Sequence, residues 1–266
     1  MTDRPLRIAT WNVNSLRVRL AHLLRWLAER SPDAVCLQET KLTDEQFPVA
    51  EIAAAGYRSV YSGQKTYNGV AILLREERCG PEEDIVRELP GLEDPQRRLL
   101  ALTVEGTRIV CGYFPNGQSV DSEKYQYKLR WLAALSAWLQ GELARHPRLA
   151  LLGDYNIAPA DEDVHDPALW KDQVLCSVPE REAFARLLGA GLEDAFRLFP
   201  QPERSYTWWD YRNLAFRRKM GLRIDHILLT HALARSCAGC TIDVGMRKLE
   251  QPSDHAPVVA ELAVPS

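Results

Sequence analysis

The chain has 266 residues, of which 46% are hydrophobic and 26% are charged, the composition of an ordinary globular protein that can bury a sizeable core. Its 33 basic and 36 acidic side chains give a formal net charge of −3, which argues against a protein that coats nucleic acid in bulk, because such a surface is strongly basic. The same balance permits an enzyme that gathers basic residues on one face and carboxylates around a metal ion.

The chain begins with MTDRPLRIATWN, which has no apolar run between a basic start and a small-residue cleavage site, so we predict no secretory signal. The longest apolar stretches, such as 149–152, have the length of a strand and fall far short of the roughly 20 residues that cross a membrane. We therefore expect a cytoplasmic protein that does not contact a membrane.

Apolar, often β-branched runs bounded by Asp, Gly, Pro or Asn predict strands. In chain order, they lie at residues 6–11, 34–38, 69–74, 99–104, 108–113, 149–153, 223–229 and 257–264. Many are continuously apolar, which predicts that both faces of the strand are covered. No repeat, low-complexity tract or Gly/Ser linker divides the chain, so we expect a single domain over residues 1–266.

Three helices are predicted between these strands. Leucines at helical spacing indicate a helix over 16–29, with Ser15 as a plausible N-cap, and a longer one over about 121–145. A third follows Ser177, with Pro179 in its first turn and Gly191 just past its end. Helices alternating with buried strands predict an α/β layered fold, and closely spaced strand pairs favour mixed sheets over purely parallel ones.

The six cysteines are scattered along the chain. Cys36 and Cys111 lie in apolar runs and are expected to be small buried hydrophobic residues. Cys237 and Cys240 form a CxxC pair, but no second pair, nearby His pair or thioredoxin-like context accompanies it. Coincidental spacing is therefore favoured over a zinc or redox site.

Polar side chains fall at or beside one end of five apolar strands. They are Asn12 and Asn14, Glu39, Asp154 and Asn156, Asp225, and the pair Asp254 and His255. Each Asp or Asn alone is more simply a turn residue that satisfies local backbone groups. Their joint occurrence favours a shared site.

Two carboxylates fit the turn interpretation poorly. Glu39 belongs to a residue type that seldom forms turns, and Asp225 lies inside an apolar strand, where a carboxylate needs a partner such as His255. Carboxylate and amide oxygens suit Mg²⁺ or Mn²⁺, which polarises a phosphoryl oxygen. An Asp positioned by an Asn can deprotonate water, and an imidazole held by a carboxylate can donate to a phosphate oxygen. The pattern therefore predicts metal-dependent phosphodiester hydrolysis.

Eight ordered segments resemble exonuclease III and the related abasic-site endonucleases over essentially the whole chain. They read TWNVNSLR, LQETK, GVAIL, GYFPNG, LLGDYNIAP, TWWDYR, GLRIDHIL and PSDHAPV. The resemblance implies the endonuclease/exonuclease/phosphatase fold, a four-layer α/β sandwich of two mixed β-sheets packed face to face and flanked by helices. It also implies Mg²⁺-dependent DNA repair activity.

The resemblance also implies roles for individual residues. Glu39 is similar to the main metal-binding carboxylate, with Asn12 as its neighbour, and Asp154 to the group that activates water, which Asn156 helps to position. Asp225 and His255 resemble the family's Asp–His pair, in which the histidine contacts the scissile phosphate. Tyr113, which lies near Asn116, resembles the tyrosine that touches the same phosphate. Without the PNG turn that follows it, Tyr113 would be predicted to be an aromatic residue of the core. Asp254 resembles a second metal-site or leaving-group carboxylate. The implied metal-binding set is Asn12, Glu39, Asp154, Asn156, Asp254 and His255.

The implied DNA contacts lie in three segments. Tyr67, Asn68, Arg97 and Arg98 are expected to reach the phosphate backbone, together with Asn116. Trp208 and Trp209 fall where relatives line the pocket for an extruded abasic sugar, although they could equally be core residues. A basic strip or a solvated charged loop would equally explain the cluster of Arg212, Arg217, Arg218, Lys219 and Arg223.

One departure from the family concerns the Tyr-x-Pro-Asn turn, where some members carry an Arg that probes the duplex. This chain has Gly117, Gln118 and Ser119 there, which puts the preference for abasic sites over 3′ ends in doubt. We expect a bacterial-type, nucleoid-acting monomer that cleaves 5′ to abasic sites, with 3′-to-5′ exonuclease and 3′-end-cleaning activity on double-stranded DNA. The alternatives are hydrolysis of inositol phosphates, sphingomyelin or RNA tails on the same scaffold, and an inactive DNA-binding or scaffold protein.

Overall fold

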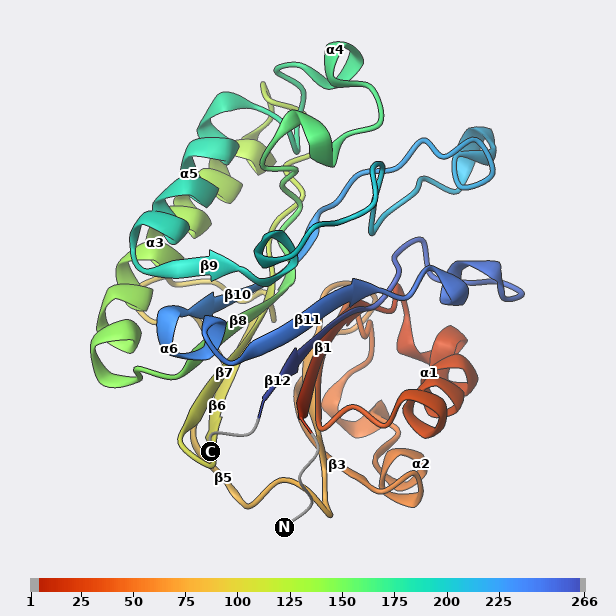
Figure 1. Ribbon diagram of the computed structural model, residues 1–266, viewed down its shortest axis with the longest axis vertical. Coiled ribbons are helices and arrows are strands. Elements are labelled where there is room, and N and C mark those ends of the chain that lie inside the picture. The colour runs from red at the N-terminus through yellow and green to blue at the C-terminus, as the bar shows by residue number, and fades with distance from the viewer. Residues whose placement is uncertain (1–4, 264–266) are drawn as a thin grey trace.

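The computed structural model describes residues 5–263, which form two six-stranded sheets packed face to face (Figure 1). The first sheet has the strand order β11 (Cys237–Ile242), β12 (Val258–Leu262), β1 (Leu6–Asn12), β2 (Ala34–Gln38), β4 (Val70–Arg75) and β3 (Tyr57–Ser62). The second has the order β5 (Glu82–Val86), β6 (Leu99–Val104), β7 (Thr107–Tyr113), β8 (Leu149–Asp154), β10 (Asp225–Thr230) and β9 (Leu192–Asp194).

Both sheets are mixed, as expected. In the first sheet β1 and β2 are parallel, and in the second β7 and β8 are parallel, while the remaining pairs are antiparallel. The expected strands are confirmed within one or two residues at each end, except for Val264, which lies outside the described residues. The four edge strands β3, β5, β9 and β11 were not predicted.

Helices cover the outer face of each sheet, which gives four layers (Figure 1). α1 (Leu16–Arg30) and α2 (Val49–Ala54) lie on the first sheet, and α3 (Glu123–Arg145) and α5 (Val178–Gly189) lie on the second. The short helices are α4 (Pro167–Trp170), α6 (His231–Ala234) and the 3₁₀ turns η1 (Asp44–Gln46), η2 (Asp161–Asp163), η3 (Ala195–Leu198), η4 (Arg212–Leu214) and η5 (Val244–Lys248). The expected α/β sandwich is confirmed.

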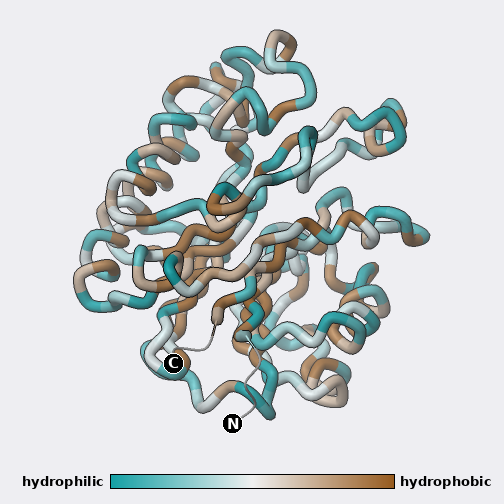
Figure 2. The backbone as a smooth tube through the Cα atoms, in the orientation of Figure 1, coloured by the Kyte–Doolittle hydropathy of each residue, from teal (hydrophilic) through white to brown (hydrophobic). Residues whose placement is uncertain are grey.

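The central strands are apolar on both faces because each face packs against a different layer (Figure 2). In β1, Ile8 points into the core between the sheets, whereas Ala9 and Trp11 pack under α1. Cys36 and Cys111 lie buried in the core between the sheets, as predicted. No helix within residues 5–263 is both long and apolar enough to cross a membrane.

The prediction that the Ser15 side chain caps α1 is wrong. Ser15 occupies the cap position, but its side chain caps nothing and its φ is 83°. Its backbone N–H instead donates to the carbonyl of Glu39 at 2.8 Å. The segment before α1 is therefore shaped by its contact with the end of β2 rather than by helix capping.

Candidate active site

The strand ends bring the predicted side chains together at one edge of the sandwich. Asn12 ends β1 and Glu39 follows β2, and these strands are parallel neighbours, so their carboxyl ends lie side by side. In the other sheet Asp225 begins β10 opposite Asp154, which ends β8, in antiparallel register. His255 comes from the segment just before β12.

Asn12 links the two sheets at this edge. Its Nδ2 donates to Glu39 Oε1 and to Asp154 Oδ2, each at 2.9 Å, so both amide hydrogens are used. The side chain is fully buried, and its own Oδ1 accepts from the backbone of Asn14. Asn12 therefore fixes the spacing between one carboxylate from each sheet.

Asp225 and His255 form the predicted pair. His255 Nδ1 lies 2.9 Å from Asp225 Oδ2, while its Nε2 lies 3.8 Å from Asp154 Oδ2. Burial lowers the pKa of His255, but the carboxylates of Asp225 and Asp154 outweigh it and raise the pKa to about 10. The raised pKa favours the protonated ring, whose Nε2 faces Asp154 in the site.

Asp154 is buried and held by two asparagines. Its Oδ1 accepts from the backbone N–H of Asn156 at 2.9 Å, and its Oδ2 accepts from the side chains of Asn12 and Asn156. Burial raises the pKa of Asp154 to about 7, with His255 acting in the opposite direction and Asp225 adding to the rise. A carboxylate with a pKa near neutrality suits proton transfer at working pH.

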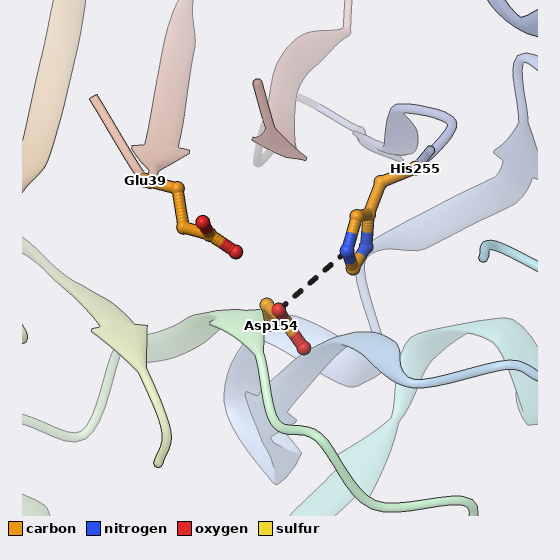
Figure 3. Close-up of side chains that lie close together, drawn as sticks. All are labelled: Glu39, Asp154 and His255. Carbon is orange, nitrogen blue, oxygen red and sulfur yellow. Dashed lines mark ion pairs between the residues drawn. The ribbon is translucent and has the colours of Figure 1, made fainter. Parts of the chain in front are cut away.

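Glu39, Asp154 and His255 offer ligand atoms that all lie within 4.8 Å of one another (Figure 3). The two carboxylates supply hard oxygens from opposite sheets, the donor type that Mg²⁺ and Mn²⁺ prefer. His255 Nδ1 is engaged by Asp225, so only its Nε2 faces the two carboxylates, and a role for His255 at the metal stays a prediction. The donor set therefore fits a divalent cation held mainly by Glu39 and Asp154.

Tyr113 and Asn116 border this cluster. Burial and the neighbouring Glu39 raise the pKa of the Tyr113 hydroxyl well above its usual value, so it stays protonated and can donate. The guanidinium of Arg98 lies 4.7 Å from the centre of the Tyr113 ring. Asn116 Nδ2 donates to Asn156 Oδ1 at 3.0 Å, which connects the predicted turn to the asparagine beside Asp154.

Asp254 lies on the outer side of the cluster rather than among the three converging ligands. Its Oδ1 accepts from Asn14 Nδ2 at 2.8 Å, and its Oδ2 accepts from Trp208 Nε1 at 2.9 Å. Both oxygens are therefore already bonded, and a role for Asp254 at the metal stays a prediction.

Four of the expected DNA contacts meet Tyr113 around a cavity of about 720 Å³. They are Tyr67, Asn68, Arg98 and Asn116. The side chain of Tyr67 is 67% exposed. Arg97 does not line this cavity and pairs with Glu88 instead.

The two tryptophans have different surroundings. Trp208 is half-buried beside Leu222 and bonds Asp254, so it borders the site. Trp209 is 5% exposed and packs with Tyr206 and Phe216, which corresponds to the core alternative rather than to a wall of the site.

One residue of the predicted basic strip, Arg223, does not lie on the surface. Arg223 is buried and its guanidinium bonds Asp163 and Asp194 at 2.6 and 2.8 Å, so it is a structural cation and not part of a DNA-binding surface. Arg212 pairs with Asp210 on the surface. Cys237 is half-buried and Cys240 is buried; both are free thiols on the edge strand β11, and neither belongs to the candidate metal group.

Two lysines of the site were not predicted. Lys41 Nζ lies 2.8 Å from Glu39 Oε2, and the LQETK segment contained this signal because the two residues are close in sequence. Lys128 Nζ donates to the backbone carbonyls of Asn116 and Asn156 from α3. The signal available for Lys128 was its place among the buried residues on one face of α3.

Comparison with known proteins gives consistent matches over the whole fold. Residues 9–255 match the model of the Endonuclease/Exonuclease/phosphatase family. The chain is 36% identical to exodeoxyribonuclease III of Haemophilus influenzae, over 96% of this chain and 99% of the relative. The structure of the 3′ phosphatase NExo from Neisseria, bound to a product DNA hairpin, is 48% identical with a TM-score of 0.93 and covers 97% of this chain and 99% of its own. An AP endonuclease from Archaeoglobus fulgidus is 40% identical with a TM-score of 0.92, over 97% of this chain and all of its own.

Proposed function

The chain belongs to the endonuclease/exonuclease/phosphatase family, and from this membership we propose that it is a Mg²⁺-dependent enzyme of base excision repair. It is a nuclease of the exonuclease III and AP endonuclease type. Its proposed reaction is hydrolysis of the phosphodiester on the 5′ side of an abasic site in double-stranded DNA, with removal of nucleotides or blocking phosphates from 3′ ends. We propose that it acts as a monomer.

The observation that carries the proposal is the convergence of Glu39, Asp154 and His255 within 4.8 Å, although the chain places them far apart. The two carboxylates would hold a divalent cation, which would neutralise charge on the phosphate and on the departing oxygen. Asp225 bonds His255 and Asn12 bonds Asp154, so these two residues hold the cluster in place.

The protein groups divide the chemistry between them. Asp154, positioned by Asn156, accepts a proton from the water whose oxygen attacks phosphorus. His255 Nε2 and the Tyr113 hydroxyl donate hydrogen bonds to non-bridging phosphate oxygens, where negative charge builds up. The phosphorus–O3′ bond breaks, the departing O3′ takes up a proton from solvent, and the products are a 3′-hydroxyl and a 5′-phosphate.

The 720 Å³ cavity beside Tyr113 supports the choice of a nucleic-acid substrate. It combines Arg98, which can neutralise a phosphate, with the exposed ring of Tyr67, which can pack against a sugar or base. A small phosphate ester such as an inositol phosphate would leave this surface unused. Competition of any phosphatase activity by abasic DNA separates these substrates.

The test is an end-labelled gel that compares abasic, recessed 3′ and 3′-phosphate duplexes with Mg²⁺ and with EDTA. We expect cleavage in Mg²⁺ and none in EDTA. Asp154→Asn should lower kcat by about 10²–10⁴-fold while duplex binding is kept. The matched control Asp161→Asn alters an exposed carboxylate and should cleave like the wild type. Cleavage that survives EDTA, or an unchanged rate for Asp154→Asn, contradicts the proposal.

A further inference from the structure

A second large cavity lies outside the candidate active site. The loops at 199–224 and 243–257 project from the same end of the sandwich (Figure 1). A cavity of about 680 Å³ lies where the first loop meets the end of β11, because its lining residues come from η3, from 201–219 and from 241–244. It shares no lining residue with the cavity beside Tyr113. Its volume is within the range of small-molecule sites, roughly 300–1,000 Å³.

Part of the cavity wall is aromatic and aliphatic. Trp209 and Phe216 line it, with their ring centroids 5.1 Å apart and an interplanar angle of 87°. Ile242 and Val244 add aliphatic surface. A Cβ atom at Gly221 would lie 2.4 Å from Trp209 Nε1, so only glycine permits this packing. The fold therefore holds the two rings in place, and an aromatic group of a ligand can pack against them.

Two nearly buried residues of the wall carry polar atoms that the protein leaves unpaired. Tyr206 is 2% exposed and Trp209 is 5% exposed, and both line the cavity. Within residues 5–263, neither the Tyr206 hydroxyl nor the Trp209 indole N–H forms a hydrogen bond. Polar atoms of buried residues are usually paired, so these two are available to the acceptors of a ligand.

The charged residues of the cavity are mainly basic. Arg204, Arg217 and Lys219 line it and are exposed. In the described part of the chain, none of these three side chains forms an ion pair, and Glu203 is the one carboxylate among the lining residues. Unpaired guanidinium and ammonium groups bind phosphate through charge-assisted hydrogen bonds. The cavity therefore combines an aromatic wall with a region that attracts an anion.

We propose that this cavity binds a nucleoside monophosphate, with the base against Trp209 and Phe216 and the phosphate among Arg204, Arg217 and Lys219. The site is separate from the candidate active site. The inference does not rest on the proposed function, because this binding needs neither a metal ion nor cleavage. Nucleoside monophosphates are also what the proposed exonuclease activity would release from 3′ ends, so the ligand would be present wherever the enzyme works.

The experiment titrates dAMP into the protein by isothermal titration calorimetry in EDTA, which keeps divalent ions out of the active site. The wild type should bind one dAMP per chain in a saturable manner. Deoxyadenosine and inorganic phosphate each supply one half of the ligand, and each should bind at least about tenfold more weakly than dAMP.

Two double variants of the same loop locate the site. Arg217→Gln with Lys219→Gln removes two charges from the cavity and should weaken dAMP binding by about tenfold or more. Arg212→Gln with Arg218→Gln removes two charges from exposed residues that do not line the cavity, and should bind dAMP like the wild type. All four side chains are exposed, so the core stays intact in both variants.

Two single variants test the polar wall and the alternative cavity. Tyr206→Phe removes only the hydroxyl and should weaken dAMP binding by about two- to tenfold. Arg98→Gln alters the cavity beside Tyr113 and should leave dAMP binding unchanged.

The inference is overturned if the wild type shows no saturable binding, or if the two double variants bind dAMP equally well. Loss of binding in Arg98→Gln overturns it too, because dAMP would then occupy the cavity beside Tyr113. These results leave the proposed function standing, since the end-labelled gel in Mg²⁺ measures cleavage independently.

Discussion

His226 is a buried histidine that follows Asp225 and remains neutral. Its Nδ1 accepts from Arg223 Nη1 at 3.0 Å, which places the proton on Nε2, where it donates to the carbonyl of Ile157 at 2.9 Å. Burial lowers the pKa of His226 to about 4, with the charge of Arg223 acting in the same direction. Protonation of Nδ1 would replace a hydrogen bond by a contact between two cations.

This histidine makes stability depend on pH. Its pKa rises to roughly 6.5 in the unfolded chain, so between about pH 4 and 6.5 the unfolded state binds more protons, and the free energy of unfolding rises with pH. The contribution, about 3 kcal/mol, is complete above 6.5 and is lost as pH falls toward 4. Urea unfolding between pH 4.5 and 7.5 measures it.

His226→Gln keeps a donor for Ile157 and removes the titrating ring, so its free energy of unfolding should depend less on pH in this window. His231→Gln alters an exposed ring and should follow the wild type. Equal pH slopes for His226→Gln and the wild type would show that another group causes the acid sensitivity.

At the scale of elements, a buried ion pair joins α3 and α5 to the loops that carry Asn116 and Asn156. Lys128 and Glu180 are both fully buried and bonded to each other. Lys128 Nζ also donates to the carbonyl of Asn156 at 2.6 Å and to that of Asn116 at 3.2 Å. Glu180 in turn accepts from the backbone of Ser177 at the start of α5. The two helices therefore hold the loops that carry both asparagines.

Lys128→Met should lower the free energy of unfolding by about 3–5 kcal/mol, because it leaves Glu180 buried without a cation. Glu180→Gln keeps an acceptor for the backbone of α5 and should lose less. Arg25→Met breaks an exposed pair with Glu29 and should cost less than about 1 kcal/mol. Urea unfolding measures the loss of unfolding free energy in each of the three variants. Equal losses would contradict the conclusion that the buried Lys128–Glu180 pair stabilises the contact between the helices and the loops.

The sequence pattern identified the interior strands and missed the edges. All eight expected strands lie inside the sheets, whereas β3, β5, β9 and β11, which were not predicted, are the four edge strands. An interior strand such as β8 is buried along its whole length and reads as an apolar run, but β5 carries Glu82, Glu83 and Asp84 because one side faces solvent. Edge strands lack the continuous apolar run by which interior strands are recognised.

The site was predicted from strand-end polar residues, and its supporting contacts were not. Asn12, Glu39, Asp154, Asp225 and His255 converge as the pattern and the family resemblance implied. Lys41 and Lys128 stand at places where the sequence carried a signal. A pattern of residue types does not show which groups a lysine reaches, so their contacts required the structure. It also cannot distinguish the half-buried Trp208 from its buried neighbour Trp209.

At the scale of the whole molecule, the candidate active site lies where the two sheets meet at one edge of the sandwich. Asn12 and Glu39 come from the first sheet, and Asp154 and Asp225 come from the second. Only the folded chain brings these groups within reach of one cation, because the residues from the first sheet and those from the second are separated by more than a hundred residues in sequence. An ion bound there bonds to both sheets.

Divalent ions should therefore stabilise the protein against heat. A ligand that binds only the native state at 100 times its Kd adds about 2.7 kcal/mol, which for a chain of this size raises Tm by roughly 5–10 °C. Differential scanning calorimetry with Mn²⁺ and with EDTA measures the shift. Glu39→Gln removes the carboxylate contributed by the first sheet and should lose most of the shift, whereas Asp161→Asn, an exposed carboxylate, should keep it. A full Mn²⁺ shift in Glu39→Gln would mean that the ion binds elsewhere, and the two sheets would then not be joined through it.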